Sequence, residues 1–238
     1  MSNTDLGEHD RSVAGMFGRI ARYYDPLNRI LSLGIDRSWR RALAKAVQPG
    51  PRGVILDLAA GTLDVSMAVA RRFHGDMVLA MDFCPPMLEL GLPKLKGDAS
   101  ERVAPVAADV KALPLADNSV DCVTMAFGIR NIIPREAAFR EMLRVLAPGG
   151  RACILEFGSG RERIWLGLYN FYLAHMLPLI GRIISSDDNA YAYLARTIGT
   201  FPAADELALE MTEAGFECVG WQKLTSGIAC LHVGQKPA

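Results

Sequence analysis

The sequence contains few of the residues that bind metals or form disulfides. Its 238 residues include five cysteines, none of them in a Cys-x-x-Cys pair, and four scattered histidines. Structural zinc sites need closely spaced pairs of such ligands, and small disulfide-linked proteins need a denser cysteine framework. We therefore expect no metal site and no disulfide framework, and the composition suits a reducing compartment.

An excess of charge of one sign is also absent. Lys and Arg total 26 and Asp and Glu total 26, so the formal net charge at pH 7 is zero. Without a global basic field we expect no nonspecific binding to nucleic acid. The first eleven residues include Asp5, Glu8 and Asp10, and no apolar run follows them. This predicts no secretory signal peptide and a cytoplasmic location.

Hydrophobic residues make up half of the chain, which is enough for a sizeable core. From residue 53 onward, short aliphatic runs at 53–58, 77–82, 102–107, 120–126 and 152–157 alternate with helical patterns at 64–73, 86–96 and 135–146. Continuous apolar strands separated by helices predict a parallel sheet covered on both faces. After a helix at 205–214, residues 216–225 and 228–235 predict two antiparallel strands at the sheet edge. The expected fold is α/β, with a doubly wound and mostly parallel sheet.

Two helical segments lie outside this pattern. We expect residues 1–48 to form an N-terminal helical lid, and residues 49–238 to form the core with a helical insertion at about 161–200. Both are candidates to cover the carboxyl ends of the strands, where ligands bind in open α/β sheets. Within the insertion, residues 164–181 carry no formal charge, a length at the threshold of a membrane span. Asn170, His175, Pro178 and the flanking arginines disfavour a span.

The first strand leads into a tight turn that is a candidate cofactor site. Asp57 ends the strand, and Gly61 and Thr62 stand in the turn before the next helix. A pyrophosphate needs several close backbone approaches, which one glycine does not provide, so a dinucleotide fits poorly. S-adenosylmethionine has no phosphates, and Asp57 and Asp64 are candidates to bind or screen its positive groups.

Two more aspartates follow the next two strands. Asp82 lies 21 residues after Gly61, close to the spacing at which an acidic residue binds ribose hydroxyls. Asp109 is a candidate acceptor for the adenine amino group, with the amide of Val110 as a donor to the ring. Each aspartate alone is as well explained as a helix cap or turn residue. Their placement at consecutive strand ends favours a nucleoside site.

Together with more specific stretches, these residues resemble the ubiquinone/menaquinone C-methyltransferase family (UbiE type), within the class I S-adenosylmethionine-dependent methyltransferases. The stretches include Tyr-Asp-x-x-Asn at 24–28, LDLAAGTLD at 56–64, FGIRN at 127–131 and RVLAPGGRACILEF at 144–157. The resemblance covers nearly the whole chain from about residue 14. It implies a seven-stranded Rossmann-like sheet, S-adenosylmethionine as methyl donor, and a polyprenylated benzoquinol or naphthoquinol as acceptor.

The resemblance also implies individual contacts. The cofactor contacts of the family would fall on Thr62, Asp82, Asp109 and Val110, with Ala126 at the end of the fourth strand. The chain departs from the family at three positions, because Leu63 replaces a glycine, Ala126 a serine and Asp36 a histidine.

Methylation of a ring carbon requires electron density at that carbon, which a deprotonated hydroxyl supplies. The protein must provide a base, or a cation that stabilises the phenolate. Arg130, next to Asn131, is the first candidate for phenolate stabilisation, with a surface salt bridge as the alternative. The second candidates are Tyr23, Tyr24, Asp25 and Asn28, because an N-terminal lid would place them over the pocket. Tyr24 also suits a packing role. The base itself is left open.

A polyprenylated acceptor has further consequences. The apolar run 164–181 would form a groove for the isoprenoid tail, with a buried core helix or a homodimer contact as alternatives. Peripheral membrane association follows from a substrate dissolved in the bilayer, and headgroup contacts would fall on basic residues that a solvated face also explains: Arg37, Arg40, Arg41, Arg161 and Arg163. The alternative functions are methylation of another lipid or small phenol, and a noncatalytic homologue that binds S-adenosylmethionine.

Overall fold

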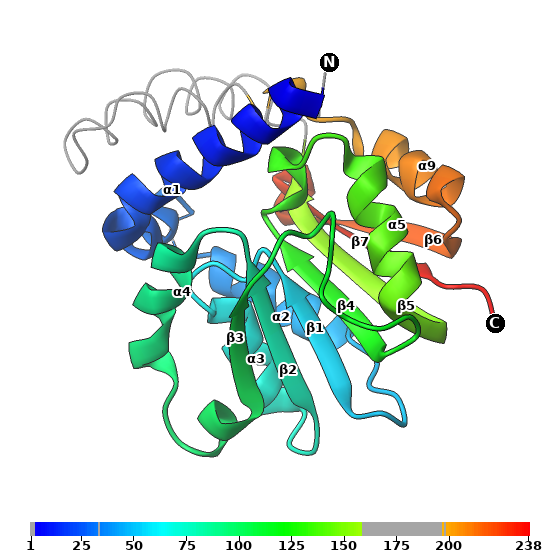
Figure 1. The fold of residues 1–238 in the computed structure, drawn as a ribbon, viewed down its shortest axis with the longest axis horizontal. Helices are drawn as coiled ribbons and strands as arrows, with labels where there is room; N and C mark the ends of the chain where they lie inside the picture. The colour runs from blue at the N-terminus through cyan, green and yellow to red at the C-terminus, as the bar shows by residue number, and fades with distance from the viewer. Residues whose placement is uncertain (1–2, 33, 159–196, 198) are drawn as a thin grey trace.

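The computed structural model describes residues 3–32, 34–158, 197 and 199–238. A seven-stranded sheet has the order β3-β2-β1-β4-β5-β7-β6 (Figure 1). Strands β1 to β5 pair in parallel, and β7 is antiparallel to both β5 and β6. The predicted mostly parallel sheet with an antiparallel edge is therefore confirmed. The strands are β1 (Val54–Leu58), β2 (Met77–Asp82), β3 (Val103–Ala107), β4 (Val120–Ala126), β5 (Leu146–Phe157), β6 (Glu217–Leu224) and β7 (Ala229–Gln235).

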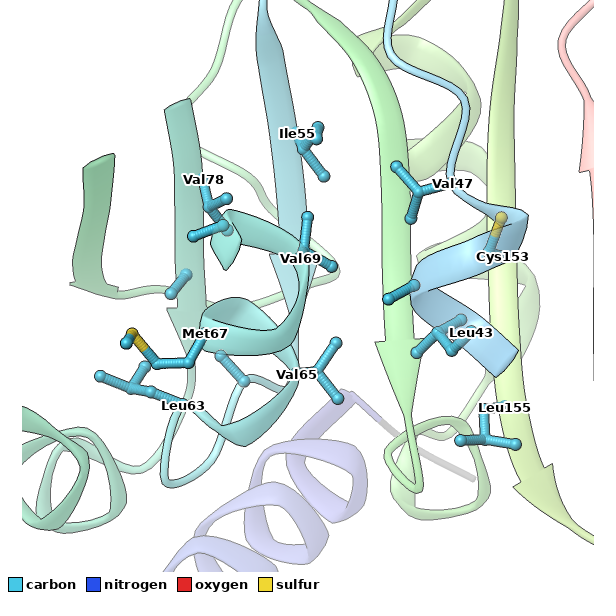
Figure 2. Close-up of a cluster of buried hydrophobic side chains, with 14 of the residues drawn as sticks. Leu43, Val47, Ile55, Leu63, Val65, Met67, Val69, Val78, Cys153 and Leu155 are labelled. Atoms are coloured by element: carbon cyan, nitrogen blue, oxygen red, sulfur yellow. The ribbon is translucent and has the colours of Figure 1, made fainter. Parts of the chain in front are cut away.

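Helices cover both faces of the sheet. Successive strand residues point to opposite faces, so Ile55 packs in one hydrophobic cluster and Leu56 in the other. The first cluster receives the apolar faces of α2 (Asp36–Ala46) and α3 (Asp64–Arg72), as Figure 2 shows for Leu43 and Val69. The second receives α5 (Arg135–Val145) and α9 (Ala204–Ala214). This is the doubly wound arrangement that the alternating pattern predicts.

The described part of the N-terminal segment forms two helices. Helix α1 (Asn3–Leu31) crosses above the sheet and packs on α4 (Pro85–Gly91) (Figure 1). Gly34, with φ of +78°, turns the chain between α1 and α2. None of the helices in the described ranges is both long and apolar enough to span a membrane. The predicted insertion, with the apolar run 164–181, Arg161 and Arg163, lies outside the described residues except at positions 197, 199 and 200.

Two elements from residue 53 onward differ by more than one residue from the extent that the sequence predicts. The helix expected at 86–96 ends at Gly91, and a 3-10 turn, η1 (Leu92–Lys94), follows it. Pro93 explains this end, because proline has no N–H and its ring clashes with the preceding helical turn. Strand β5 begins at Leu146 instead of 152, because Leu146 pairs with Val120 of β4.

Candidate active site

A pocket lies under α1 at the carboxyl ends of β1, β2 and β4. It holds about 850 Å³ of empty space, part of it open to solvent. Several predicted site residues line it together: Tyr24, Gly61, Asp82, Asp109, Val110, Ala126 and Asn131. The described lining does not include Asp25, Asp57, Thr62 or Arg130, which are close in sequence to lining residues. The pattern therefore located the pocket, but it did not separate residues that face it from residues that support it.

The turn after β1 has an unusual backbone. Ala59, Gly61 and Leu63 have φ values of 51°, 53° and 66°, a region that costs a non-glycine residue roughly 1 kcal/mol. Leu63 is fully buried, and a Cβ placed on Gly91 of α4 would lie 2.5 Å from its Cγ. The side chain thus enters the core beside Met67 (Figure 2). The Leu63 side chain is absent from the described pocket lining.

Asp82 faces the pocket and also holds the turn. Its Oδ2 accepts a hydrogen bond from the Gly61 amide at 2.7 Å, and its Oδ1 accepts one from the Cys84 amide at 2.8 Å. Each carboxylate oxygen has a second lone pair, so Asp82 retains capacity for a ligand's hydroxyls. Burial raises the pKa of this carboxyl, and the two amides oppose the rise.

The adenine end of the predicted site is formed by the loop after β3. Asp109 Oδ1 accepts a hydrogen bond from the Lys111 amide at 2.8 Å, which fixes the loop that presents Val110 to the pocket. Lys111 also lines the pocket, and its Nζ lies 3.4 Å from the Ile133 carbonyl oxygen. Met81 and Ile132 add apolar walls. This lining suits a planar, mostly apolar ring system with a few polar edges.

Asp57 acts inside the fold. Its carboxylate accepts hydrogen bonds from the Ser66 hydroxyl at 2.5 Å and the Thr124 hydroxyl at 2.7 Å, and thereby links β1 to α3 and β4. The residue is 1% exposed. Burial raises the pKa of this carboxyl to about 6, and the two hydroxyls oppose the rise. Asp57 is buried and absent from the described pocket lining, so it is not placed for the direct contact with the cofactor that the sequence suggested.

The buried Asp57 predicts a pH dependence of stability. Between pH 4 and 6 the folded state keeps a proton that the unfolded chain, with a pKa near 3.8, has released. Stability from this group is therefore present below about pH 4 and is lost as the pH rises through about 6. A neutral amide at this position would lack this loss, so we expect Asp57→Asn to gain about 3 kcal/mol relative to the wild type between pH 4 and 7. Urea unfolding of the wild type and Asp57→Asn at pH 4 and pH 7 measures the difference in unfolding free energy between the two proteins. Asp98→Asn, at an exposed aspartate, is the control. A difference in unfolding free energy that stays the same at both pH values would contradict the prediction.

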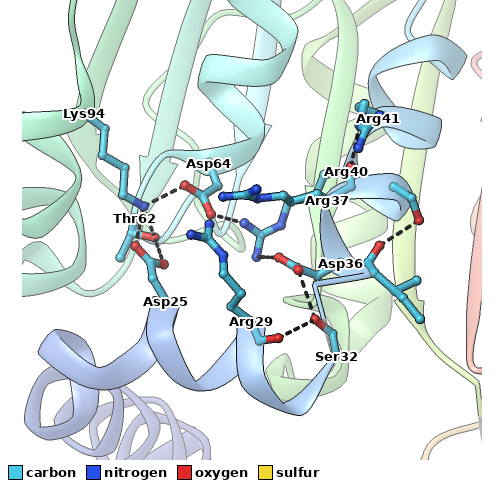
Figure 3. A network of polar contacts seen from close by, with 12 residues as sticks. Asp25, Arg29, Ser32, Asp36, Arg37, Arg40, Arg41, Thr62, Asp64 and Lys94 are labelled. Carbon is cyan, nitrogen blue, oxygen red and sulfur yellow. Dashed lines mark hydrogen bonds and ion pairs between the residues drawn. The ribbon is translucent and has the colours of Figure 1, made fainter.

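Asp25 and Thr62 belong to a polar network that fastens α1 and α2 to the turn (Figure 3). The Thr62 hydroxyl donates to Asp25 Oδ1 at 2.6 Å and accepts from Lys94 Nζ at 2.9 Å. Lys94 also pairs with Asp25 and, at 2.7 Å, with Asp64. Asp64 carries the network to a second cation, Arg40.

Arg40 extends this network into α2. Its guanidinium pairs with Asp64 and, at 3.6 Å, with Asp36, which accepts a hydrogen bond from the Ser32 hydroxyl. Asp36, which replaces the family's histidine, is thus part of an ion-pair chain. Arg40 is buried, so the expectation that it contacts lipid headgroups is wrong. Arg37 and Arg41 are exposed.

The network predicts that Lys94 positions α1 over the turn. Lys94→Met would leave Asp25 and Asp64 without their shared cation, and we expect a loss of about 1–3 kcal/mol in unfolding free energy. We also expect the KM for the methyl donor to rise more than kcat falls. Urea unfolding and initial rates measure the two effects. Lys94→Arg should restore both, and Lys96→Met, at an exposed neighbour, should change neither. An unchanged KM in a folded Lys94→Met variant would contradict this role.

Tyr24 lies on the pocket side of α1. Burial raises the pKa of its phenol, whereas the positive charges of Arg130 and Arg40 and a hydrogen bond with Asn28 oppose the rise. The phenol is therefore protonated at neutral pH and can donate a hydrogen bond into the pocket. It stacks edge-on against Phe17, with ring centroids 6.0 Å apart.

Arg130 is engaged by an unexpected partner. Its Nη1 donates to Glu156 Oε1 at 2.6 Å and to the Phe127 carbonyl at 2.7 Å, and the guanidinium lies 5.4 Å from the centre of the Phe157 ring. The side chains of Arg130 and Glu156 are 4% and 1% exposed. Arg130 is therefore not placed to contact an acceptor phenolate. Its charge nevertheless acts on the Tyr24 phenol.

The comparisons with known proteins agree with this geometry. Residues 4–236 match the model of the ubiE/COQ5 methyltransferase family. The chain belongs to this family. A demethylmenaquinone methyltransferase of Mycobacterium marinum is 42% identical over 237 residues, which cover 100% of this chain and 99% of the relative. A ubiquinone/menaquinone biosynthesis C-methyltransferase of Geotalea daltonii is 41% identical, with 97% and 99% covered.

Solved structures share the fold at low sequence identity. The crystal structure of the cyclase SpnF has a TM-score of 0.69 at 17% identity, covering 96% of this chain and 97% of that one. An S-adenosylmethionine-dependent methyltransferase from Thermotoga maritima, described as a possible histamine N-methyltransferase, has a TM-score of 0.65 at 17% identity, with 93% and 98% covered. These likenesses show the Rossmann-like fold of class I methyltransferases. The resemblance seen in the sequence is confirmed.

A ubiE/COQ5 family member uses S-adenosylmethionine as its methyl donor, and the pocket of this chain fits that cofactor. Asp82, Asp109 and Val110 line this pocket beside the apolar side chains of Met81 and Ile132. A Cβ on Gly128 would lie 2.5 Å from the Ala59 Cβ, so this glycine lets two loops of the pocket meet. Lys111 is the one basic side chain in the described lining, which disfavours a pyrophosphate.

Several pocket residues were not predicted from the sequence. Phe17, Phe83, Met87, Lys111 and Phe127 all line the pocket. Phe127 has a φ of 58°, and strained residues of this kind gather at functional sites. The sequence contains one signal for Glu156, because a single carboxylate in the otherwise apolar end of a strand indicates a buried charge with a partner.

Proposed function

We propose that this chain transfers a methyl group from S-adenosylmethionine to a ring carbon of a polyprenylated naphthoquinol, converting demethylmenaquinol to menaquinol. The observation that carries the proposal is the end-to-end similarity, at 42% identity, to a protein named demethylmenaquinone methyltransferase. The pocket supports it, because the carboxylates of Asp82 and Asp109 and the aromatic side chains of Phe17 and Tyr24 line the same space.

The cofactor residues have distinct roles in this proposal. When bound, S-adenosylmethionine supplies an electrophilic methyl group on a positively charged sulfur. Asp82 binds the ribose hydroxyls, Asp109 and Val110 bind the adenine edge, and Gly61 and Ala126 allow close approach of the ligand. Asp57 and Thr62 keep the turn in place from behind, through the hydrogen bonds of their side chains.

At the acceptor end, Tyr24 and Asn131 are the proposed contacts. The Tyr24 phenol keeps its proton at Oη and donates a hydrogen bond to the acceptor oxygen on which negative charge develops. Asn131 borders the same space and orients the ring. Arg130 acts from behind through its charge, and Asp25 acts through Lys94 and Thr62 by holding α1 in place. We propose residues 1–48 as the cover of this site.

Methyl transfer to a reduced acceptor tests the proposed function. The purified chain is incubated with methyl-labelled S-adenosylmethionine and demethylmenaquinol in detergent under reducing conditions, and the product is weighed by mass spectrometry. A gain of one methyl on the ring is the expected result. A demethylated benzoquinol is offered in parallel, and preference for it would move the substrate to the ubiquinone series. No transfer to either quinol, with transfer to another lipid or a small phenol, would overturn the proposal.

We further propose that the protein works at the membrane surface, because a polyprenylated acceptor resides in the bilayer. The tail must leave the lipid for its ring to reach the methyl donor. Quinone pools extracted from cells with and without the gene would show whether the enzyme reaches this substrate in place. A species lighter by one methyl should accumulate without the gene.

A further inference from the structure

Charge is unevenly distributed in a chain whose net charge is zero. Residues 11–46 contain eight basic and two acidic residues. Both acidic residues, Asp25 and Asp36, pair with cations of the internal network. Three acidic residues precede this stretch at the amino end of α1, namely Asp5, Glu8 and Asp10. From residue 11 onward, the exposed charges of α1 are therefore positive.

The positive charges of α1 follow one row of the helix. Arg11, Arg19, Arg22 and Arg29 are all exposed, and successive members are spaced by three, seven or eight residues, which are nearly whole turns. Phe17 and Tyr24, on another face, line the pocket. The helix thus exposes arginines on one side and lines the site with another.

An exposed apolar strip runs beside this basic row. Of the large hydrophobic side chains that are exposed in the described residues, Phe83, Leu90 and Leu92 lie within one short segment, with exposed fractions of 46%, 41% and 48%. Pro85, Pro86 and Pro93 are exposed in the same segment, and Glu89 is its one exposed charge between residues 83 and 93.

Three contacts fix this strip alongside α1. Cys84 Sγ lies 3.5 Å from the Ala14 carbonyl oxygen, the Pro86 ring lies 3.8 Å from the Cβ position of Gly18, and Lys94 pairs with Asp25. Residues 84–94 therefore follow α1 from residue 14 to residue 25. Phe83, at the start of the strip, also lines the pocket, so the strip reaches the site.

We propose that α1 and residues 83–93 form a face that docks on an anionic lipid bilayer, and that Phe83 marks where the acceptor's tail passes from the lipid into the pocket. The proposal rests on the proposed function for the identity of the acceptor, and charge complementarity selects the partner. Arginines in a row bind anionic headgroups, and adjacent leucine and phenylalanine side chains enter the boundary between headgroups and acyl chains.

Vesicle binding of the full chain tests this face. We expect binding to vesicles of phosphatidylcholine mixed with phosphatidylglycerol, and much weaker binding to phosphatidylcholine alone. The double variant Arg19→Gln, Arg22→Gln should bind the anionic vesicles about 25-fold more weakly, at about fivefold per arginine. Leu90→Ser, Leu92→Ser should weaken binding at least about tenfold. Phe83 is left unchanged in these variants because it lines the pocket.

Matched controls keep the test specific to this face. Arg37→Gln, Arg41→Gln removes two exposed charges from α2, and Leu209→Ser removes an exposed leucine from α9. Both should bind vesicles as the wild type does. Equal binding by the α1 variant and the wild type, an equal loss in the controls, or no binding by the wild type would overturn the proposal.

Methyl transfer to two acceptors, one water-soluble and one held in vesicles, separates this proposal from the proposed function. A short-chain, water-soluble naphthoquinol should be methylated equally by the wild type and by both docking-face variants. The same ring on a long tail in vesicles should be methylated with a higher KM by those variants. If the wild type methylates neither acceptor, the proposed function fails, while the vesicle-binding result still decides the docking face.

Discussion

Replacing Asp82 by alanine is expected to weaken the binding of S-adenosylmethionine by about 100-fold or more. Two hydrogen bonds from ribose hydroxyls to a carboxylate would be lost, each worth about 1.5–3 kcal/mol. The amides of Gly61 and Cys84 would also lose their acceptor, so the turn that carries the cofactor would loosen. Both effects act on affinity, and the second also acts on the alignment of the methyl group.

Calorimetric titration with S-adenosylhomocysteine measures the loss directly. Asp82→Asn should fall between alanine and wild type, because its one amide oxygen still accepts hydrogen bonds but carries no charge. Asp98→Asn, an exposed aspartate, should bind the ligand as the wild type does. Circular dichroism confirms that each variant is folded. Wild-type affinity in a folded Asp82→Ala variant would place the nucleoside elsewhere.

The sequence predicted the fold well where the signal is local. The limits of β2 and β4 follow the prediction residue for residue, because an apolar run bounded by turn residues carries both its identity and its ends. Asp82 and Asp109 line the pocket because the ends of parallel strands share one edge of the sheet. The error at α4 was also local, since Pro93 ends a helix that its apolar period alone would continue.

The support of the site could not be predicted in the same way. Thr62 donates a hydrogen bond to Asp25, which lies 37 residues away in the sequence, and Arg130 pairs with Glu156, which lies 26 residues away. Which charged side chains meet depends on the packing of α1 over the turn and of β4 against β5. A motif places such residues near the site, but it does not say which of them face the ligand. For this reason Arg130 and Asp25 were expected in the pocket and lie behind it.

The buried pair of Arg130 and Glu156 gives the second large prediction. Removing one partner leaves the other charge buried without its counterion, which typically costs about 3–5 kcal/mol. We expect Arg130→Ala and Glu156→Ala each to lower the free energy of unfolding by this amount. The double variant Arg130→Met, Glu156→Leu buries no charge, so its stability should return close to that of the wild type. Urea unfolding of all four proteins measures these changes in unfolding free energy.

The stable double variant then isolates what the Arg130 charge does for the reaction. The Arg130 charge opposes the rise in the pKa of the Tyr24 phenol, and the same positive field favours negative charge on an acceptor oxygen beside that phenol. We therefore expect the double variant to fold like the wild type and to transfer methyl groups slowly, with the rise of kcat displaced to higher pH. If kcat and its pH profile return together with stability, Arg130 serves only to join β4 to β5, and the field acting on the acceptor must come from another cation.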